Sequence, residues 1–391
     1  MTPEPPEITP ELLQQNPVLA ILLTFFSLFV LGGAVAAIGA WAWLLWRLRT
    51  GQPILESVPW RPRVWGLADL IAILIGFYFL QIAFLGLGVP ALGVDIEAIK
   101  AGETPPMAFN AWLSLSNLCA VALAVGWIML RFQVPISHIG WTRPTVKELA
   151  IGVVAGLIVI PVVYVVSAVV NLSFHEEYSH PILEALQSEA TLASFLMACF
   201  VAVIAAPISE EFAFRVLLQG WLQSLPGATA AQALLGRINQ PVSATRGEAV
   251  YVADGEPSAP IIAEPAEGES SSARTAGMTA PSPHPADAPD ISISAAYAPP
   301  ASTVPAEPND VHGPQVAPAW APLVSGTLFG LAHWGYGLSF VPLILFGIAL
   351  GFVYRARCSI WPCIVMHVML NATSMIAMAV QVMLLRATSG G

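Results

Sequence analysis

Long apolar stretches recur along the chain, and polar residues are concentrated between them. An α-helix needs about 20 apolar residues to cross the hydrocarbon core of a bilayer, and most of these stretches reach that length. The pattern therefore predicts an all-α fold, a polytopic membrane bundle of about eight transmembrane helices. The predicted spans are residues 18–46, 65–90, 107–131, 148–172, 191–225, 318–335, 337–355 and 359–386.

The composition points to the same class of protein. Hydrophobic residues make up 56% of the 391 residues and charged residues only 10%, with a mean hydropathy of +0.71. Since an ordinary soluble domain carries about 25% charged residues, this chain cannot cover a globule's surface with solvated side chains. The formal net charge of −10 leaves no basic stripe for phosphates, so we expect the lipid bilayer as a partner and no nucleic acid.

Basic residues gather in alternate loops, and by the positive-inside rule these loops face the cytoplasm. Such a loop follows the first, third and seventh spans. Both termini are then predicted to lie outside a cell membrane, and residues 226–317 in the cytoplasm. The basic residues concerned are Arg47, Arg49, Arg61, Arg63, Arg131, Arg143, Lys147, Arg355 and Arg357.

Residues 226–317 differ in composition from the rest of the chain. They are rich in Pro, Ala, Ser and acidic residues and show neither a helical nor a strand period. Such a segment cannot bury enough apolar surface to offset its chain entropy, so we predict a disordered cytoplasmic insertion, either a docking tail or, as the favoured interpretation, a tolerated linker. It would separate N-terminal transmembrane helices (1–134) and the first part of a helical core (135–225) from the second part of that core (318–391).

Ionisable side chains inside predicted spans are costly in a bilayer, and each is a candidate functional residue. The fifth span contains Glu210, Glu211 and Arg215. Glu211 and Arg215 are four residues apart, so they share a helix face and can neutralise each other. Glu210 points about 100° away, which predicts a carboxylate without a dedicated partner, suited to a general base. An ion-pair cluster that stabilises the bundle is an equally good interpretation of this segment alone.

Two later spans carry histidines. His333 lies in the sixth span, where a lone histidine on an apolar helix is more often a core residue than a catalyst. His367 and Asn371 share one face of the eighth span, and they could bind a metal, donate to an oxyanion or join helices by hydrogen bonds. Four further polar residues lie near span ends and are interpreted as helix–helix or interface hydrogen-bonders: Asp69, Asn110, Asn117 and Asn171.

Depth along the helices favours one shared site. At about 1.5 Å per residue, Glu210 and His333 each lie about 22 Å from the predicted cytoplasmic ends of their spans. His367 lies about 12 Å into its own span, and Asn371 is one turn deeper. Because the three clusters reach compatible depths, we predict that they form one functional site.

Three short motifs follow one another on these spans: Glu210-Glu211-Phe-Ala-Phe-Arg215, Phe329-Gly-Leu-Ala-His333 and His367-Val-Met-Leu-Asn371. They resemble the EExxxR, FxxxH and HxxxN marks of the CPBP family of intramembrane proteases, which includes the type II CAAX prenyl endopeptidases and the bacteriocin-immunity Abi proteins. The resemblance covers roughly residues 135–386, and the first three spans contribute little to it. The first two motifs are farther apart than is usual in the family, and the predicted insertion accounts for most of that gap.

The resemblance implies an intramembrane endopeptidase that hydrolyses a peptide bond in a membrane-embedded or lipid-anchored peptide or protein. Glu210, helped by His333, would activate a water molecule for attack on the scissile carbonyl. His367 and Asn371 would stabilise the oxyanion of the tetrahedral intermediate.

Supporting roles and alternatives follow from the same resemblance. Glu211 with Arg215 would hold the fifth helix in place, and Phe329 belongs to the same supporting set. No cofactor is expected: zinc could bind two Glu and two His, but a metal-free glutamate mechanism is favoured. The alternative function is a non-catalytic membrane binding, immunity or scaffold protein. A proton-coupled transporter is disfavoured because the ionisable clusters occur in the C-terminal half only.

Overall fold

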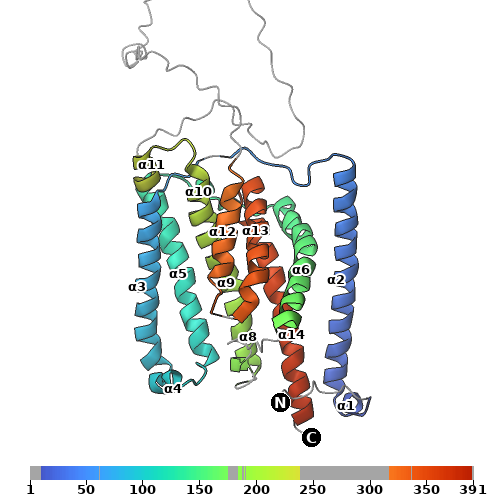
Figure 1. Ribbon diagram of the computed structural model, residues 1–391. Helices are drawn as coiled ribbons and strands as arrows, with labels where there is room; N and C mark the ends of the chain where they lie inside the picture. The colour runs from blue at the N-terminus through green and yellow to red at the C-terminus, as the bar shows by residue number, and fades with distance from the viewer. Residues whose placement is uncertain are drawn as a thin grey trace, which may run out of the picture. The chain divides into compact units, whose positions relative to one another are not determined.

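The computed structural model of the protein describes residues 10–60, 62–174, 184–186, 189, 191–237, 317–335 and 337–389. Every regular element within these residues is a helix (Figure 1). Seven helices of this described part are long and apolar enough to cross a membrane, which confirms the predicted all-α, multi-pass bundle. Their bounds are Pro17–Arg49 (α2), Leu67–Ala91 (α3), Met107–Phe132 (α5), Val146–Phe174 (α6), Leu192–Ser224, Gly337–Arg357 and Trp361–Ala387.

Short elements precede or join the long helices. α1 (Pro10–Gln15) comes before α2, and η1 (Ile136–Ile139) comes between α5 and α6. α4 (Ile96–Lys100) joins α3 to α5. It begins at Asp95, whose carboxylate accepts hydrogen bonds from two backbone N–H groups of the first turn and so acts as its N-cap.

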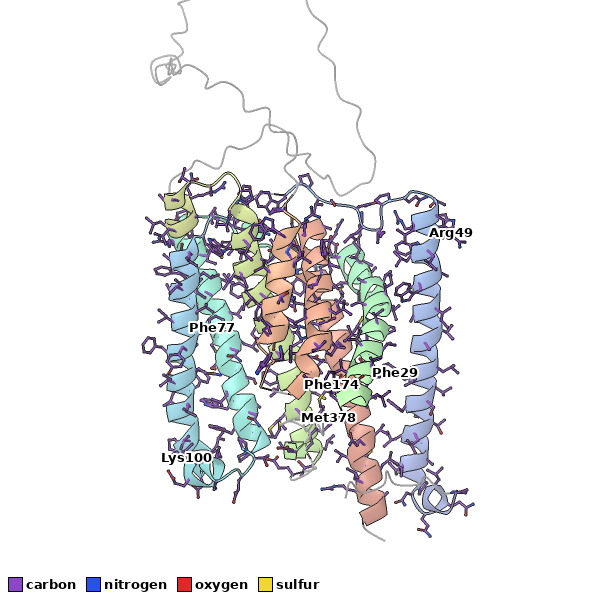
Figure 2. All side chains as sticks on the ribbon, viewed as in Figure 1. Phe29, Arg49, Phe77, Lys100, Phe174 and Met378 are labelled. Atoms are coloured by element: carbon purple, nitrogen blue, oxygen red, sulfur yellow. The ribbon has the colours of Figure 1, made fainter. Side chains whose placement is uncertain are left out.

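The long helices keep apolar side chains on their outer surface and charged side chains at their ends. Phe29 of α2 is 48% exposed and Phe174 of α6 is 65% exposed. Arg49 and Lys100 instead mark two opposite ends of the bundle (Figure 2). An exposed apolar surface of this extent suits contact with lipid rather than water.

The loops that the sequence marks as basic lie at one end of the bundle (Figure 1). α2 and α5 end there, and α3 and α6 begin there. α13 (Phe340–Arg357) also ends there, and α14 (Trp361–Ser389) begins there. The opposite end, around α4, carries Glu97 and Glu103. The helices thus alternate in direction as predicted, and the assignment of the basic end to the cytoplasm remains a prediction.

The predicted sixth span, 318–335, is shorter than a membrane-crossing helix. α12 (Trp320–Leu331) has 12 residues, a length of about 18 Å against about 30 Å of hydrocarbon. The chain then turns back through η5 (Gly337–Ser339) into α13. α12 and α13 therefore form a hairpin that enters the bundle from the basic end and reverses inside it.

Glycines allow the two arms of this hairpin to come into contact. A Cβ atom at Gly326 would lie 2.3 Å from the backbone nitrogen of Ile348, and one at Gly330 would lie 2.4 Å from the side chain of Ile344. Neither position could hold a larger residue without separating the helices. His333 follows directly in the turn and so lies inside the bundle rather than at its surface end.

The described structure extends a short way into the segment predicted as an insertion. Thr229 caps α11 (Ala230–Leu235) by accepting a hydrogen bond from the backbone N–H of Gln232. Trp221 Nε1 donates to the Ala233 carbonyl at 2.9 Å, which fixes this helix to the preceding one. The first residues of the segment thus belong to the helical body, and residues 238–316 lie outside the described residues.

The orientation of the bundle can be tested by labelling single cysteines in intact cells. We expect Ala230→Cys and Thr50→Cys to react with a membrane-impermeant thiol reagent only after the cytoplasmic side is opened, because both lie at the basic end. Ala101→Cys, next to α4, should react from outside, and the parent protein with its four native cysteines gives the background. Labelling of all three from the same side would contradict the predicted topology.

Candidate active site

The fifth span is one continuous helical segment interrupted by two π-helical stretches. α8 (Leu192–Cys199) leads into the π-helix η2 (Phe200–Ala205), α9 (Ala206–Glu211) follows, and the π-helix η3 (Phe212–Gln219) leads into α10 (Gly220–Ser224). Such stretches change the face on which the following residues lie and are frequent at functional sites. Here they flank the short α-helix that carries both candidate glutamates.

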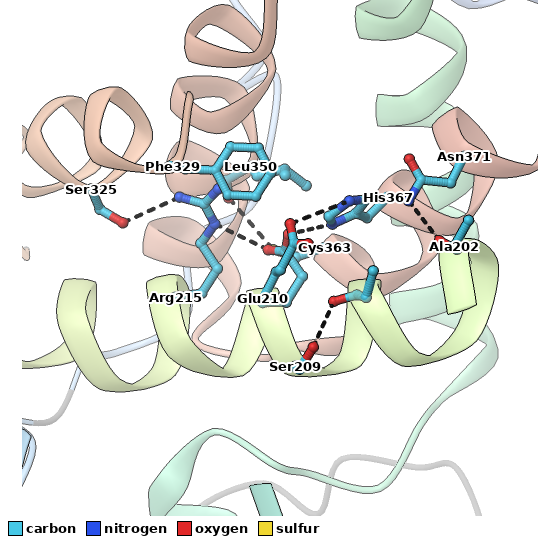
Figure 3. Close-up of polar contacts among 12 residues, drawn as sticks. Ala202, Ser209, Glu210, Arg215, Ser325, Phe329, Leu350, Cys363, His367 and Asn371 are labelled. Carbon is cyan, nitrogen blue, oxygen red and sulfur yellow. Dashed lines mark hydrogen bonds and ion pairs between the residues drawn. The ribbon is translucent and has the colours of Figure 1, made fainter. Parts of the chain in front are cut away.

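The carboxylate of Glu211 is fully buried, and both of its oxygens are bonded. Oε2 accepts from Arg215 Nε at 3.0 Å, and Oε1 lies 2.8 Å from His367 Nδ1. Arg215, also fully buried, donates from Nη1 to Ser325 Oγ at 3.2 Å (Figure 3). Ser325 in turn donates to the Phe214 carbonyl at 2.9 Å. This network joins α9 and η3 to α12 and α14.

Glu210, one residue earlier, has a different environment. Its side chain is 28% exposed, and Oε2 lies 3.8 Å from His333 Nε2 and 3.9 Å from His367 Nε2. Both separations exceed the length of a hydrogen bond. Oε2 has no hydrogen-bond partner among the residues that the structure describes. The predicted contrast between the two glutamates, one paired with Arg215 and one without a dedicated partner, is present in the geometry.

Phe329 fixes the two imidazoles. Its ring lies 5.3 Å from that of His333 and 5.6 Å from that of His367, centroid to centroid, and the Arg215 guanidinium lies 5.0 Å from its centroid. The Phe329 carbonyl lies 3.0 Å from His333 Nδ1. Because a carbonyl can only accept, His333 donates from Nδ1, and in the neutral ring Nε2 is the unprotonated nitrogen that faces Glu210.

Asn371 joins α14 to the fifth span. Its Nδ2 donates to the Ala202 carbonyl at 2.7 Å. In a π-helix the carbonyl of residue i bonds the N–H of residue i+5, and Ala206 N–H does donate to Val201 in this way. The corresponding donor for Ala202 would be Pro207, which has no N–H. The sequence thus leaves a carbonyl that Asn371 satisfies with one of its two amide protons, and the other proton remains for a ligand.

A cavity of about 540 Å³ brings these groups together. Glu210, His333, His367 and Asn371 all line it, so the structure places the four predicted site residues at one cavity inside the bundle.

The N-terminal helices line the same cavity, which the sequence did not predict. Gln81 of α3 and Asn110, Ser114 and Asn117 of α5 form part of its wall. Neither asparagine carboxamide bonds to another residue in the described part of the chain, so the predicted helix–helix hydrogen bonds are not present there, and a role as interface hydrogen-bonders stays a prediction.

The arrangement of donors does not fit a zinc ion closely. Zinc bonds of about 2.0–2.1 Å would place two tetrahedral donors about 3.4 Å apart, whereas both imidazole nitrogens lie nearly 4 Å from the Glu210 oxygen. Across the residues that the structure describes, no group of three or more His, Cys, Asp or Glu side chains is placed to hold a metal ion.

Residues 309–373 match the family described as Type II CAAX prenyl endopeptidase Rce1-like. The matched part is about a sixth of the chain and includes Phe329, His333, His367 and Asn371 but not Glu210. No curated protein and no solved structure matches the chain. The match supports assignment of the chain to the CPBP family of CAAX-type membrane proteases, in agreement with the three motifs.

Several polar contacts of the site were not predicted from the sequence. Ser325 looks like an ordinary small residue of an apolar helix, yet it is buried and accepts from Arg215. The Glu211–His367 bond joins residues 156 positions apart, so no local spacing indicates it. The first contact depends on how α12 packs against η3, and the second on how α14 packs against α9.

We expect Glu211→Gln to lower the free energy of unfolding by about 3–5 kcal/mol, because it leaves Arg215 buried without a counter-charge. The matched variant Glu210→Gln should lower it by less than about 1 kcal/mol, since its carboxylate has no such partner. Denaturant unfolding in detergent micelles, followed by tryptophan fluorescence, measures both. Equal losses in the two variants would contradict the separate environments of these glutamates.

Proposed function

We propose that this protein is an intramembrane endopeptidase that hydrolyses a peptide bond in a membrane-embedded or lipid-anchored substrate. The observation that carries the proposal is the Glu210 carboxylate, which faces two imidazole nitrogens at 3.8 and 3.9 Å across a cavity inside membrane-spanning helices. A carboxylate held there without a hydrogen-bond partner among the described residues costs free energy, and a catalytic use explains why the chain retains it.

The first step is the attack of water on the scissile carbonyl. Glu210 accepts one proton of a water molecule in the cavity, and the hydroxide equivalent bonds to the carbonyl carbon. His333, whose Nε2 faces the same space, accepts a hydrogen bond from the second proton of that water and so orients its oxygen. The carbonyl π electrons move to oxygen, which gives a tetrahedral intermediate with an oxyanion.

The second step is the collapse of this intermediate. Asn371 offers its second amide proton to the oxyanion, and His367, held through Nδ1 by Glu211, would stabilise the oxyanion from Nε2 when that nitrogen carries a proton. The C–N bond then breaks, and the proton held by Glu210 moves to the leaving amine. The carboxyl product and the amine product leave, and Glu210 is again ionised.

The matched family bears on the substrate class. Its description names prenyl endopeptidases of CAAX sequences. By that likeness, we propose that the substrate presents a short peptide segment close to a lipid-buried anchor, so that the segment reaches Glu210 from within the bilayer. A cavity of about 540 Å³ has room for a few residues of such a segment and not for a folded domain.

We expect detergent-purified protein to cleave members of a fluorogenic peptide library that includes farnesylated C-terminal CAAX peptides. Glu210→Ala should lower kcat/KM by about 10² to 10⁴, the usual contribution of a general base. Wild-type activity should persist after treatment with a strong chelator, and product masses from mass spectrometry should identify the cleaved bond.

A matched control is Glu103→Ala, which removes an exposed carboxylate from the loop between α4 and α5. This variant should cleave the library peptides at the wild-type rate. Equal turnover by wild type and Glu210→Ala would remove Glu210 from the mechanism. Loss of wild-type activity on chelation would show a metal-dependent reaction. A protein that binds library peptides but cleaves none would favour the non-catalytic binding function instead.

A further inference from the structure

α5 presents a row of polar side chains to the cavity. Asn110, Ser114 and Asn117 are spaced i, i+4 and i+7, so they lie on one face of the helix, and all three line the cavity. We call these three residues the α5 polar face. Since Glu210 lines the same cavity from α9, the face and the candidate catalytic groups share one cavity.

The position of Asn117 makes this face unusual for a membrane helix. It is ten residues past Met107, the first residue of α5, and so lies about 15 Å along the axis, near the middle of a bilayer about 30 Å thick. Polar side chains at that depth are retained at a cost and normally have partners or a function.

The two asparagines differ from the polar groups beside them in having no such partner. Ser114 Oγ donates to the Asn110 carbonyl at 2.9 Å, and Gln81 accepts a hydrogen bond from Ser116. The Asn110 and Asn117 carboxamides bond to no other residue of the described chain. Each therefore offers two N–H donors and a carbonyl acceptor to whatever occupies the cavity.

A peptide that reaches Glu210 needs groups of this kind. Its scissile carbonyl must be freed from helical hydrogen bonds before water can attack it, so the segment is extended. In a bilayer, the backbone N–H and C=O groups that are exposed in this way have no water to bond and require partners from the protein. A carboxamide can bond both a backbone N–H and a backbone C=O.

The spacing of the face agrees with an extended chain. Seven residues of helix separate Asn110 from Asn117 and correspond to about 10.5 Å. Three residues of an extended strand span about 10 Å, so the two carboxamides can reach backbone groups three residues apart. We propose that the α5 polar face binds the backbone of an extended substrate segment across the cavity from Glu210, and this proposal rests on the proposed function.

The test separates binding from hydrolysis by using Glu210→Gln protein, which should bind without cleaving. It is immobilised in detergent and incubated with a library of twelve-residue apolar peptides, and retained peptides are counted by mass spectrometry. Adding Asn110→Leu and Asn117→Leu should lower retention at least about tenfold, as expected for the loss of two hydrogen-bonding side chains. In the wild-type background the same pair should raise KM while Glu210-dependent cleavage remains.

The matched control is Asn171→Leu, which makes the same change at an exposed position at the end of α6 and should leave retention unchanged. The variants could lose retention because they misfold, so a second library carries N-methyl groups on alternate backbone amides. These peptides lack the N–H donors, and their retention is measured on protein in which the α5 polar face is intact. Methylation should lower retention much more with Asn110 and Asn117 present than with both replaced by leucine.

The outcomes distinguish this inference from the proposed function. Cleavage that depends on Glu210 but is unchanged by Asn110→Leu and Asn117→Leu would support the endopeptidase function and overturn the proposed role of the α5 polar face. Retention that depends on the two asparagines without any wild-type cleavage would support the face and overturn the hydrolysis. No retention by the Glu210→Gln protein, or equal retention of methylated and unmethylated peptides, would overturn the inference.

Discussion

The Glu211 carboxylate lies entirely inside a bundle whose outer surface is apolar, so the protein itself must supply everything that stabilises its charge. Arg215 neutralises the charge from the same helix, and His367 bonds the second oxygen from α14. Arg215 also bonds Ser325 on α12. These contacts fix the relative positions of three helical segments from distant parts of the sequence, because a shift of any of them would leave a buried ion or imidazole without its partner.

The fixed positions of these three segments place the Glu210 carboxylate at the cavity. The two glutamates are neighbours in sequence, but one turns into the protein and the other lines the cavity. The same contacts that hold Glu211 orient His367 so that its Nε2 faces Glu210, and Phe329 packs against both histidine rings. The supporting groups and the reacting groups are therefore parts of one arrangement, in which the buried ion pair determines the geometry of the Glu210 carboxylate.

The sequence predicts the helical bundle and the four residues that meet at the cavity, because span length and charge inside apolar helices are strong local signals. It does not predict the α12–α13 hairpin, whose reversal depends on the contact of Gly326 and Gly330 with the facing helix. Nor does it predict the two π-helices or the wall formed by α5, since asparagines in an apolar helix have several uses and only packing shows which way they face.

The separate roles of the two glutamates are tested most directly by chemical rescue. Glu210→Gly leaves space beside the cavity that a small carboxylate can enter, whereas the space left by Glu211→Gly is closed to solvent. Hydrolysis is measured for each variant with increasing sodium formate, and sodium chloride serves as the control for ionic strength. The account predicts a formate-dependent return of hydrolysis in Glu210→Gly and none in Glu211→Gly. Rescue of Glu211→Gly alone, or full activity of Glu210→Gly without formate, would contradict it.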